Sequence, residues 1–193
     1  MRSNKLLFKP ENLSAYKYAI ALNLKGDSFK KIKKIQNDLK KKLHIKFYSQ
    51  RSHTPHIRIS NSFGVRNKKN FEDLIKELKK MSQKKFKLDF RNPAVFLENE
   101  IYAVLRWVQN KEIFILKNKI EKMIGRKIKN YKKELNFIAK TTIAFKDVKK
   151  SNLVKVIDLL KKSKLPNYTL IDNLCLYAFK LGLEEKKVIE ISF

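Results

Sequence analysis

The chain has 193 residues, of which 46 are Lys or Arg and 18 are Asp or Glu, so its formal net charge is +28. This length suffices for one domain that buries roughly 70% of the surface of the unfolded chain. Cys175 is the only cysteine, which excludes an intramolecular disulfide and a cysteine-rich metal site. The apolar run near the N-terminus, Leu6 to Phe8, is too short for a signal peptide core or a membrane helix.

We therefore expect one soluble, monomeric domain in a reducing, cytoplasmic setting, with no membrane association. The charge favours a polyanionic partner, with nucleic acid first and an anionic membrane surface second. Lysine supplies most of this charge, since only seven of the 46 basic residues are Arg. The alternative is that the lysines reflect a genome rich in A and T and lie on solvated helix faces.

In the first half of the chain, apolar runs and helical spacing of apolar residues predict an alternation of strands and helices. Asp27 or Ser28 is a candidate cap for the first helix and Asn70 for the second. After a loose N-terminal arm over 1–15, the expected elements are a strand over 18–24, a helix to about 43, a short strand over 44–48, a strand over 55–60 and a helix over 67–81.

The second half continues the alternation, and its boundaries are set by turn residues. We expect turns at Asn92–Pro93 and at 98–100, and a helix that ends at Gly125. The expected elements are strands over 86–90, 94–97 and 101–108, a helix over 111–124, a strand over 136–145, a helix over 149–162, and strands over 169–180 and 187–193. The order recurs about 85 residues apart, which predicts one domain over 1–193 with pseudo-repeat halves of about 16–108 and 109–193.

Two of these strands each carry a pair of polar residues two positions apart. The first pair is His56 and Arg58, and the second is Lys140 and Thr142. Residues i and i+2 of a strand point to the same face of a sheet, so each strand presents its pair to one surface.

This arrangement resembles the two-histidine (2H) phosphoesterase superfamily, which includes the 2′-5′ RNA ligases and RNA 2′,3′-cyclic phosphodiesterases. Its signature is two strands that each read His-x-Thr/Ser, and both copies are degenerate here. The resemblance spans nearly the whole chain. It implies an α+β fold, a bilobal duplicated unit in which two antiparallel sheets line a central cleft with helices outside, and it implies no metal or cofactor.

The resemblance also assigns roles by position. His56 and Lys140 occupy the positions of the two catalytic imidazoles, which exchange protons with the attacking and leaving oxygens. Arg58 and Thr142 occupy the positions of the hydroxyls that hold the phosphate oxygens. Phe145 stands where the RNA ligases often carry a basic residue. Phe145 and Trp107 are candidates for base stacking, although core packing is the commoner role of such residues.

The two departures differ in consequence. A guanidinium at Arg58 still binds phosphate, as a bidentate donor. A lysine at 140 is a poorer acid and base near neutral pH than an imidazole, and losing one acid/base group costs roughly 10²- to 10⁴-fold in rate. His44 and His53 lie outside the motif and are expected at the surface, with His53 near enough to serve as a substitute proton carrier.

We therefore expect a divergent phosphoesterase that acts on RNA ends or 2′,3′-cyclic phosphates, by hydrolysis or ligation. The alternative is a catalytically inactive RNA-binding module of the same fold. A phosphoesterase for a small nucleotide or an acyl-phosphopantetheine-type diester is a third reading, since fold alone does not choose a substrate.

Overall fold

The computed structural model describes residues 6–47, 54–81, 83–98, 101–108, 110–128, 131–133, 135–180 and 185–193. The helices in these ranges are α1 (Gly26–Leu43), α2 (Lys68–Lys80), α3 (Lys111–Lys127) and α4 (Leu153–Lys162). The strands are β1 (Lys17–Asn23), β2 (His56–Arg58), β3 (Phe63–Gly64), β4 (Phe86–Glu98), β5 (Ile101–Val108), β6 (Lys140–Ala144), β7 (Tyr168–Ile171), β8 (Asn173–Phe179) and β9 (Lys186–Ser192). Short 3₁₀ turns lie at Leu13–Ala15 and Lys150–Asn152.

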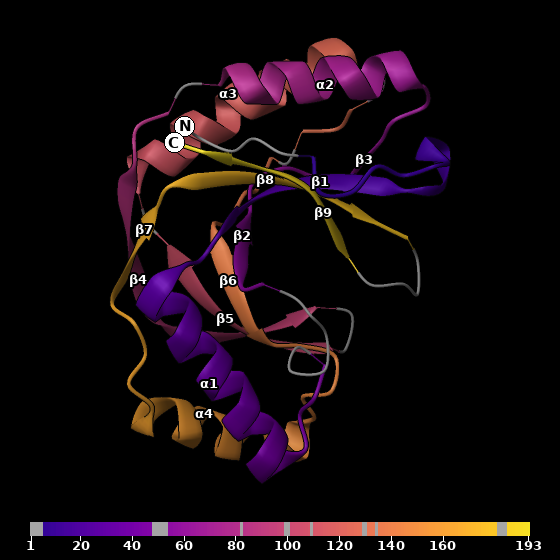
Figure 1. Ribbon diagram of the computed structural model, residues 1–193. Coiled ribbons are helices and arrows are strands. Elements are labelled where there is room, and N and C mark those ends of the chain that lie inside the picture. Colours follow the sequence, from indigo (N-terminus) through magenta and orange to yellow (C-terminus); the bar gives the residue numbers. More distant parts are fainter. Residues whose placement is uncertain are drawn as a thin grey trace.

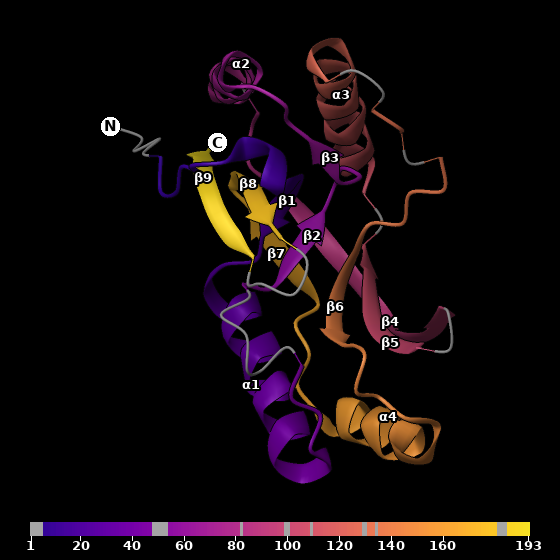
Figure 2. The same cartoon turned by 90° about the vertical axis from the view of Figure 1, so that its right-hand side faces the viewer.

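The strands form two antiparallel sheets that meet at the motif strands. Hydrogen bonds link the strands in one series, β7-β4-β5-β6-β2-β1-β8-β9, with β3 also on β1. The last four strands of this series, with β3, form one antiparallel sheet and the first four form the other. They join where Ile57 of β2 pairs with Thr141 of β6. Helices α2 and α3 cover one end of the molecule and α1 and α4 the other (Figures 1 and 2). The α+β architecture, with two antiparallel sheets and helices outside, is confirmed.

Strand β1 is the centre of the first sheet, and its two faces differ in character. Tyr18, Ile20 and Leu22 are fully buried in the core that includes residues of α2 and α3. Ala19, Ala21 and Asn23 point to the opposite face, because side chains alternate along a strand. All three are buried, and Ala21 packs with Cys175 and Tyr177.

A second apolar core holds α1 and α4 against β6. Ile35 and Leu39 of α1 pack with Val156 and Leu160 of α4 and with Ile143 of β6. The spacing of these residues on each helix puts them on one face, with lysines on the other. Each sheet takes strands from both halves of the predicted pseudo-repeat, which remains a prediction.

The helix boundaries differ from the sequence expectations at four places. Helix α4 begins at Leu153 rather than at about 149, because residues 150–152 form a 3₁₀ turn. Helix α1 begins at Gly26, so Asp27 and Ser28 are not caps, and the Ser28 hydroxyl donates instead to the Tyr168 carbonyl at 2.8 Å. Asn67 rather than Asn70 caps α2, because its side chain accepts from the Asn70 N–H.

Helix α3 passes through Gly125 and ends at Lys127. Ile124 and Ile128 are both buried, and the Ile128 N–H donates to the Ile124 carbonyl at 2.7 Å. Burial of these side chains outweighs the cost of an internal glycine, about 1 kcal/mol.

Several predicted strands also change. Residues 44–47 form no strand, because the N–H groups of Lys46 and Phe47 donate to the Asp147 carboxylate, while Tyr48 lies outside the described residues. The predicted turn at Asn92–Pro93 is an irregularity within the continuous strand β4. The strand predicted over 169–180 is two strands, β7 and β8, that break at Asp172, and both motif strands are shorter than expected.

Candidate phosphate-binding site on the motif strands

The two motif pairs lie on adjacent strands. Because β2 and β6 are antiparallel and Ile57 pairs with Thr141, His56 lies opposite Thr142 and Arg58 lies opposite Lys140. Cross-strand partners point to the same face, so these four side chains share one surface, which we call the motif face. Residues directly opposite have Cβ atoms about 4.5–5.5 Å apart and diagonal neighbours such as His56 and Lys140 lie about 7–8 Å apart.

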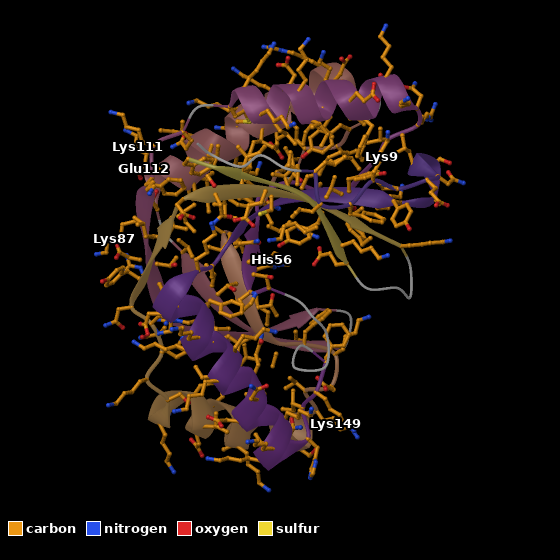
Figure 3. All side chains as sticks on the ribbon, in the orientation of Figure 1. Lys9, His56, Lys87, Lys111, Glu112 and Lys149 are labelled. Atoms are coloured by element: carbon orange, nitrogen blue, oxygen red, sulfur yellow. The ribbon has the colours of Figure 1, made fainter. Side chains whose placement is uncertain are left out.

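His56 lies between the two helical ends of the molecule, on β2 (Figure 3). Its side chain is half-buried, and its Nδ1 lies 3.0 Å from the Thr54 carbonyl oxygen. A carbonyl only accepts, so Nδ1 carries the proton in this hydrogen bond, and in the neutral imidazole the basic lone pair is on Nε2. This tautomer suits a general base.

Tyr177 of β8 supports the His56 ring. The two rings stack with centroids 5.5 Å apart and an interplanar angle of 29°. The Tyr177 hydroxyl donates to Asn23 Oδ1 at 2.6 Å, and Asn23 pairs with His56 across β1 and β2. Burial raises the pKa of Tyr177 well above its ordinary range, so the phenol stays protonated and keeps donating.

The Asn23 backbone extends this polar layer to β8. Its N–H donates to Asn173 Oδ1 at 2.9 Å, and Asn173 Nδ2 donates back to the Asn23 carbonyl at 3.0 Å. Both asparagines are buried. The sequence analysis missed these residues and Tyr177. In the sequence, the two asparagines stand at the ends of apolar runs. Asparagine in that position is equally typical of a turn, so the sequence alone does not indicate a buried pair.

An ion cluster lies at the outer end of this layer. Lys25 contacts Asp172 at 3.0 Å and Glu190 at 2.8 Å, and Lys187 contacts Glu190 at 2.6 Å. Burial raises the pKa of Glu190, but hydrogen bonds from Lys187 and Lys25 outweigh it and leave the pKa below its ordinary value. Burial likewise opposes the hydrogen bonds from Asn173 and Lys25 that lower the pKa of Asp172. Both carboxylates are therefore ionised near neutral pH.

Arg58 and Lys140 concentrate positive charge on the motif face. Arg58 is exposed, Lys140 is half-buried, and they are direct cross-strand neighbours. Like charges in this position destabilise a sheet unless an anion lies between them. Together with the Thr142 hydroxyl, they offer donors for the non-bridging oxygens of a phosphate.

The two predicted stacking residues have different surroundings. Phe145 follows β6, is half-buried, and packs edge-on against Phe47 with ring centroids 5.9 Å apart. Trp107 pairs with Lys140 across β5 and β6, but its side chain lies outside the described residues. A stacking role for either remains a prediction. His44 is exposed at the end of α1, as expected, and His53 lies outside the described residues.

Among the described residues, no three His, Cys, Asp or Glu side chains come together as a metal site would require. In that part of the chain, no helix is both long and apolar enough to cross a membrane. Cys175 is fully buried beside Ala21 and Tyr177, and burial raises the pKa of its thiol.

Several solved structures have a fold similar to that of this chain. E. coli LigT in complex with 3′-AMP is similar with a TM-score of 0.59 at 11% identity, covering 92% of this chain and 98% of LigT. A crystal structure of a phosphoesterase gives a TM-score of 0.58 at 11% identity, covering 92% of this chain and 99% of that chain. Kluyveromyces marxianus Usb1 gives 0.50 at 11% identity, covering 91% and 99% of Usb1. No protein-family model and no curated protein sequence matches the chain.

The chain therefore has the fold of the two-histidine phosphoesterases, the class to which LigT belongs. The likeness covers nearly the full length of both chains, so it concerns the whole bilobal unit rather than one sheet.

Proposed function

We propose that this protein binds RNA ends that carry a 2′,3′-cyclic phosphate, and hydrolyses that ester slowly with His56 as its acid/base group. The observation that carries the proposal is the pairing of β2 with β6, which puts His56, Arg58, Lys140 and Thr142 on one face. Nucleotide and phosphate complexes of similar folds support a ligand of this chemistry: LigT with 3′-AMP and with phosphate, and Usb1 with uridine monophosphate.

Each motif residue has one role in this proposal. Arg58, Lys140 and Thr142 hold the non-bridging oxygens, and two cations on neighbouring strands compensate the charge of the bound phosphodiester. His56 Nε2 takes a proton from a water molecule as the water oxygen attacks phosphorus. The bond from phosphorus to one ribose oxygen breaks, and a phosphate monoester is released.

Protonation of the leaving oxygen is the least assisted step of this reaction. The leaving oxygen takes its proton from solvent, because a lysine ammonium is a much weaker acid than an imidazolium. The missing second imidazole costs roughly 10²- to 10⁴-fold relative to an intact acid/base pair. Slow turnover is therefore an intrinsic property of this motif face.

The test compares single variants with a nucleoside 2′,3′-cyclic phosphate as the probe. His56→Ala is expected to lower the rate of hydrolysis by roughly 10²-fold or more while retaining much of the affinity. Lys140→Ala is expected to weaken binding more than it changes the rate of the bound ester. Unchanged turnover in His56→Ala would place the reaction elsewhere in the molecule.

A second function is favoured by one observation, the direct opposition of Arg58 and Lys140. Two neighbouring cations on the motif face suit a module that binds phosphate tightly but does not hydrolyse the ester. The same experiment separates the two functions. A protein that binds the cyclic phosphate through Arg58 and Lys140 but never hydrolyses it is the RNA-end-binding module.

A further inference from the structure

Helices α1 and α4 pack side by side at the end of the molecule opposite α2 and α3 (Figures 1 and 2). Between them is a groove of about 690 Å³, separate from the motif face. Its lining includes three apolar side chains, Ile35, Leu43 and Leu159. It also includes six lysines from both helices and the segment after α4: Lys31, Lys34, Lys42, Lys155, Lys162 and Lys164.

The charge of this groove is strongly one-sided. Its charged lining residues are the six lysines and two aspartates, Asp38 and Asp158, which gives a net charge of +4. Lys34, Lys155 and Lys162 are exposed. At physiological ionic strength the screening length is about 8 Å, so cations on the two walls of one groove reinforce each other. The groove therefore attracts a polyanion.

α1 and α2 have similar lysine contents but differ in their acids, and in α1 Asp27 pairs with Lys31. α1 has seven lysines and two aspartates in 18 residues, and α2 has five lysines and three acidic residues in 13. The lysine density is thus the same, whereas the net charge is +5 against +2. All three acids of α2 pair with lysines, Glu72 with Lys68, Glu77 with Lys80, and Asp73 with Lys127.

We propose that the α1–α4 groove binds the phosphate backbone of single-stranded RNA whose end is held at the motif face. This inference rests on the proposed function. A positively charged groove that follows one backbone is a common mode of single-strand binding. The lysines come from both walls of the groove, so an RNA strand that lies in it contacts lysines on both sides. The lining holds no aromatic residue that could stack on a base, so binding here is independent of sequence.

The groove and the motif face share a strand. Gln36 of α1 donates to the Ile143 carbonyl of β6 at 3.3 Å, so α1 lies directly on the strand that carries Lys140 and Thr142. Ile143 points into the core beneath α1, and Lys140 and Thr142 point to the opposite face. An RNA that occupies both surfaces passes around one lobe.

The test uses two triple variants that remove the same charge from different lobes. One is Lys34→Gln with Lys155→Gln and Lys162→Gln in the groove. The control removes three exposed lysines of α2: Lys69→Gln, Lys76→Gln and Lys79→Gln. Anisotropy of a labelled single-stranded RNA of about 20 nucleotides is followed from about 50 to 200 mM salt.

We expect the groove variant to lose roughly 10-fold or more in affinity and its log–log salt slope to fall by about 2, since each single-strand phosphate contact contributes about 0.7. The α2 variant should lose much less. Lys34→Arg with Lys155→Arg and Lys162→Arg should bind like the parent, which shows that charge rather than local structure is responsible.

Equal losses in the two Gln variants would overturn the inference, because net charge alone would then explain the binding. Vesicles of phosphatidylcholine and phosphatidylserine that bind through the groove, while RNA does not, would overturn it in favour of a membrane surface. The cyclic mononucleotide is too small to reach the groove, so its binding should survive in the groove variant. Slower hydrolysis of the mononucleotide in His56→Ala and weaker binding in Lys140→Ala test the proposed function separately.

Discussion

At the residue scale, the site depends on His56 being held in one orientation. The Thr54 carbonyl fixes its tautomer, and the Tyr177 ring, itself 4% exposed, supports its plane. Tyr177 is in turn fixed by its hydrogen bond to Asn23. We infer that Tyr177 is a positioning residue for the imidazole rather than a catalytic one.

Two variants of Tyr177 distinguish the contribution of its ring from that of its hydroxyl. Tyr177→Phe keeps the stack but leaves Asn23 Oδ1 without its donor, so it should cost about 1–3 kcal/mol of unfolding free energy and hardly change phosphate binding. Tyr177→Leu removes the stack and should lower the rate of cyclic phosphate hydrolysis roughly 10-fold, with a smaller effect on binding. Denaturant unfolding, the hydrolysis rate and the NMR titration of the His56 ring measure these effects. An unshifted His56 titration and an unchanged hydrolysis rate in Tyr177→Leu would contradict the positioning role.

The sequence predicted the motif residues but not their supports. His56 and Thr142 are recognisable because they fall two positions from a polar partner on an apolar strand. Tyr177 and Asn23 are distant in sequence from His56 and reach it only through the pairing of β1 with β2 and β8. No local pattern encodes a cross-strand neighbour, so these contacts appear only with the register.

At the element scale, the irregularity of β4 has an identifiable cause. Arg106 of β5 is 3% exposed, and it donates to the Arg91 carbonyl at 2.7 Å and to the Pro166 carbonyl. Its guanidinium also lies 5.1 Å from the centroid of the Phe90 ring. These bonds satisfy carbonyls beside Pro93, so the strand continues where the sequence predicted a turn.

Removing this guanidinium should be costly. Arg106→Met leaves two carbonyls without donors in a buried position and should lower the free energy of unfolding by about 3 kcal/mol, measured by denaturant titration. Arg126→Met on the exposed surface of α3 is the matched control and should change it by less than about 0.5 kcal/mol. Similar values for both would mean that the bulge is held by other contacts.

The ion cluster that joins Lys25 and Asp172 to Glu190 of β9 makes a pH-dependent contribution to stability. Glu190 and Asp172 have folded pKa values below the ordinary ones, so their stabilisation is present above about pH 4 and is lost as the pH falls through the folded values. Glu190→Gln should therefore flatten the fall of the melting temperature between about pH 5 and 3. Glu72→Gln removes an exposed carboxylate 3.9 Å from Lys68 and should leave the acid profile nearly parental. A parental profile in Glu190→Gln would contradict the stabilising role of the cluster.

At the scale of the whole molecule, apolar periodicity predicted most elements, including β1, α1, α2 and α4, and the family resemblance predicted the fold class. Apolar periodicity did not predict which strands share a sheet. The first sheet combines β1 and β2 with β8 and β9, and the second combines β4 and β5 with β6 and β7. Such pairings join residues more than 150 positions apart in the sequence, as Lys17 of β1 and Phe179 of β8 do. They depend on the whole core rather than on any local window.

We propose that β2 and β6 still hold a two-histidine phosphoesterase site in which one imidazole and one hydroxyl are replaced. If the backbone geometry is intact, restoring the missing groups requires no redesign of the fold. Lys140→His together with Arg58→Thr changes one half-buried and one exposed side chain, so it should cost little stability.

The measurement is hydrolysis of a nucleoside 2′,3′-cyclic phosphate by the parent and the double variant. We predict a rise of roughly 10-fold or more, equal to about 1.4 kcal/mol in the barrier, with most of the gain already present in Lys140→His alone. A double variant whose circular dichroism and melting are parental, yet whose activity does not exceed that of the parent on several cyclic phosphates, would contradict the claim. The motif face would then lack the catalytic geometry, and phosphate binding would be its remaining function.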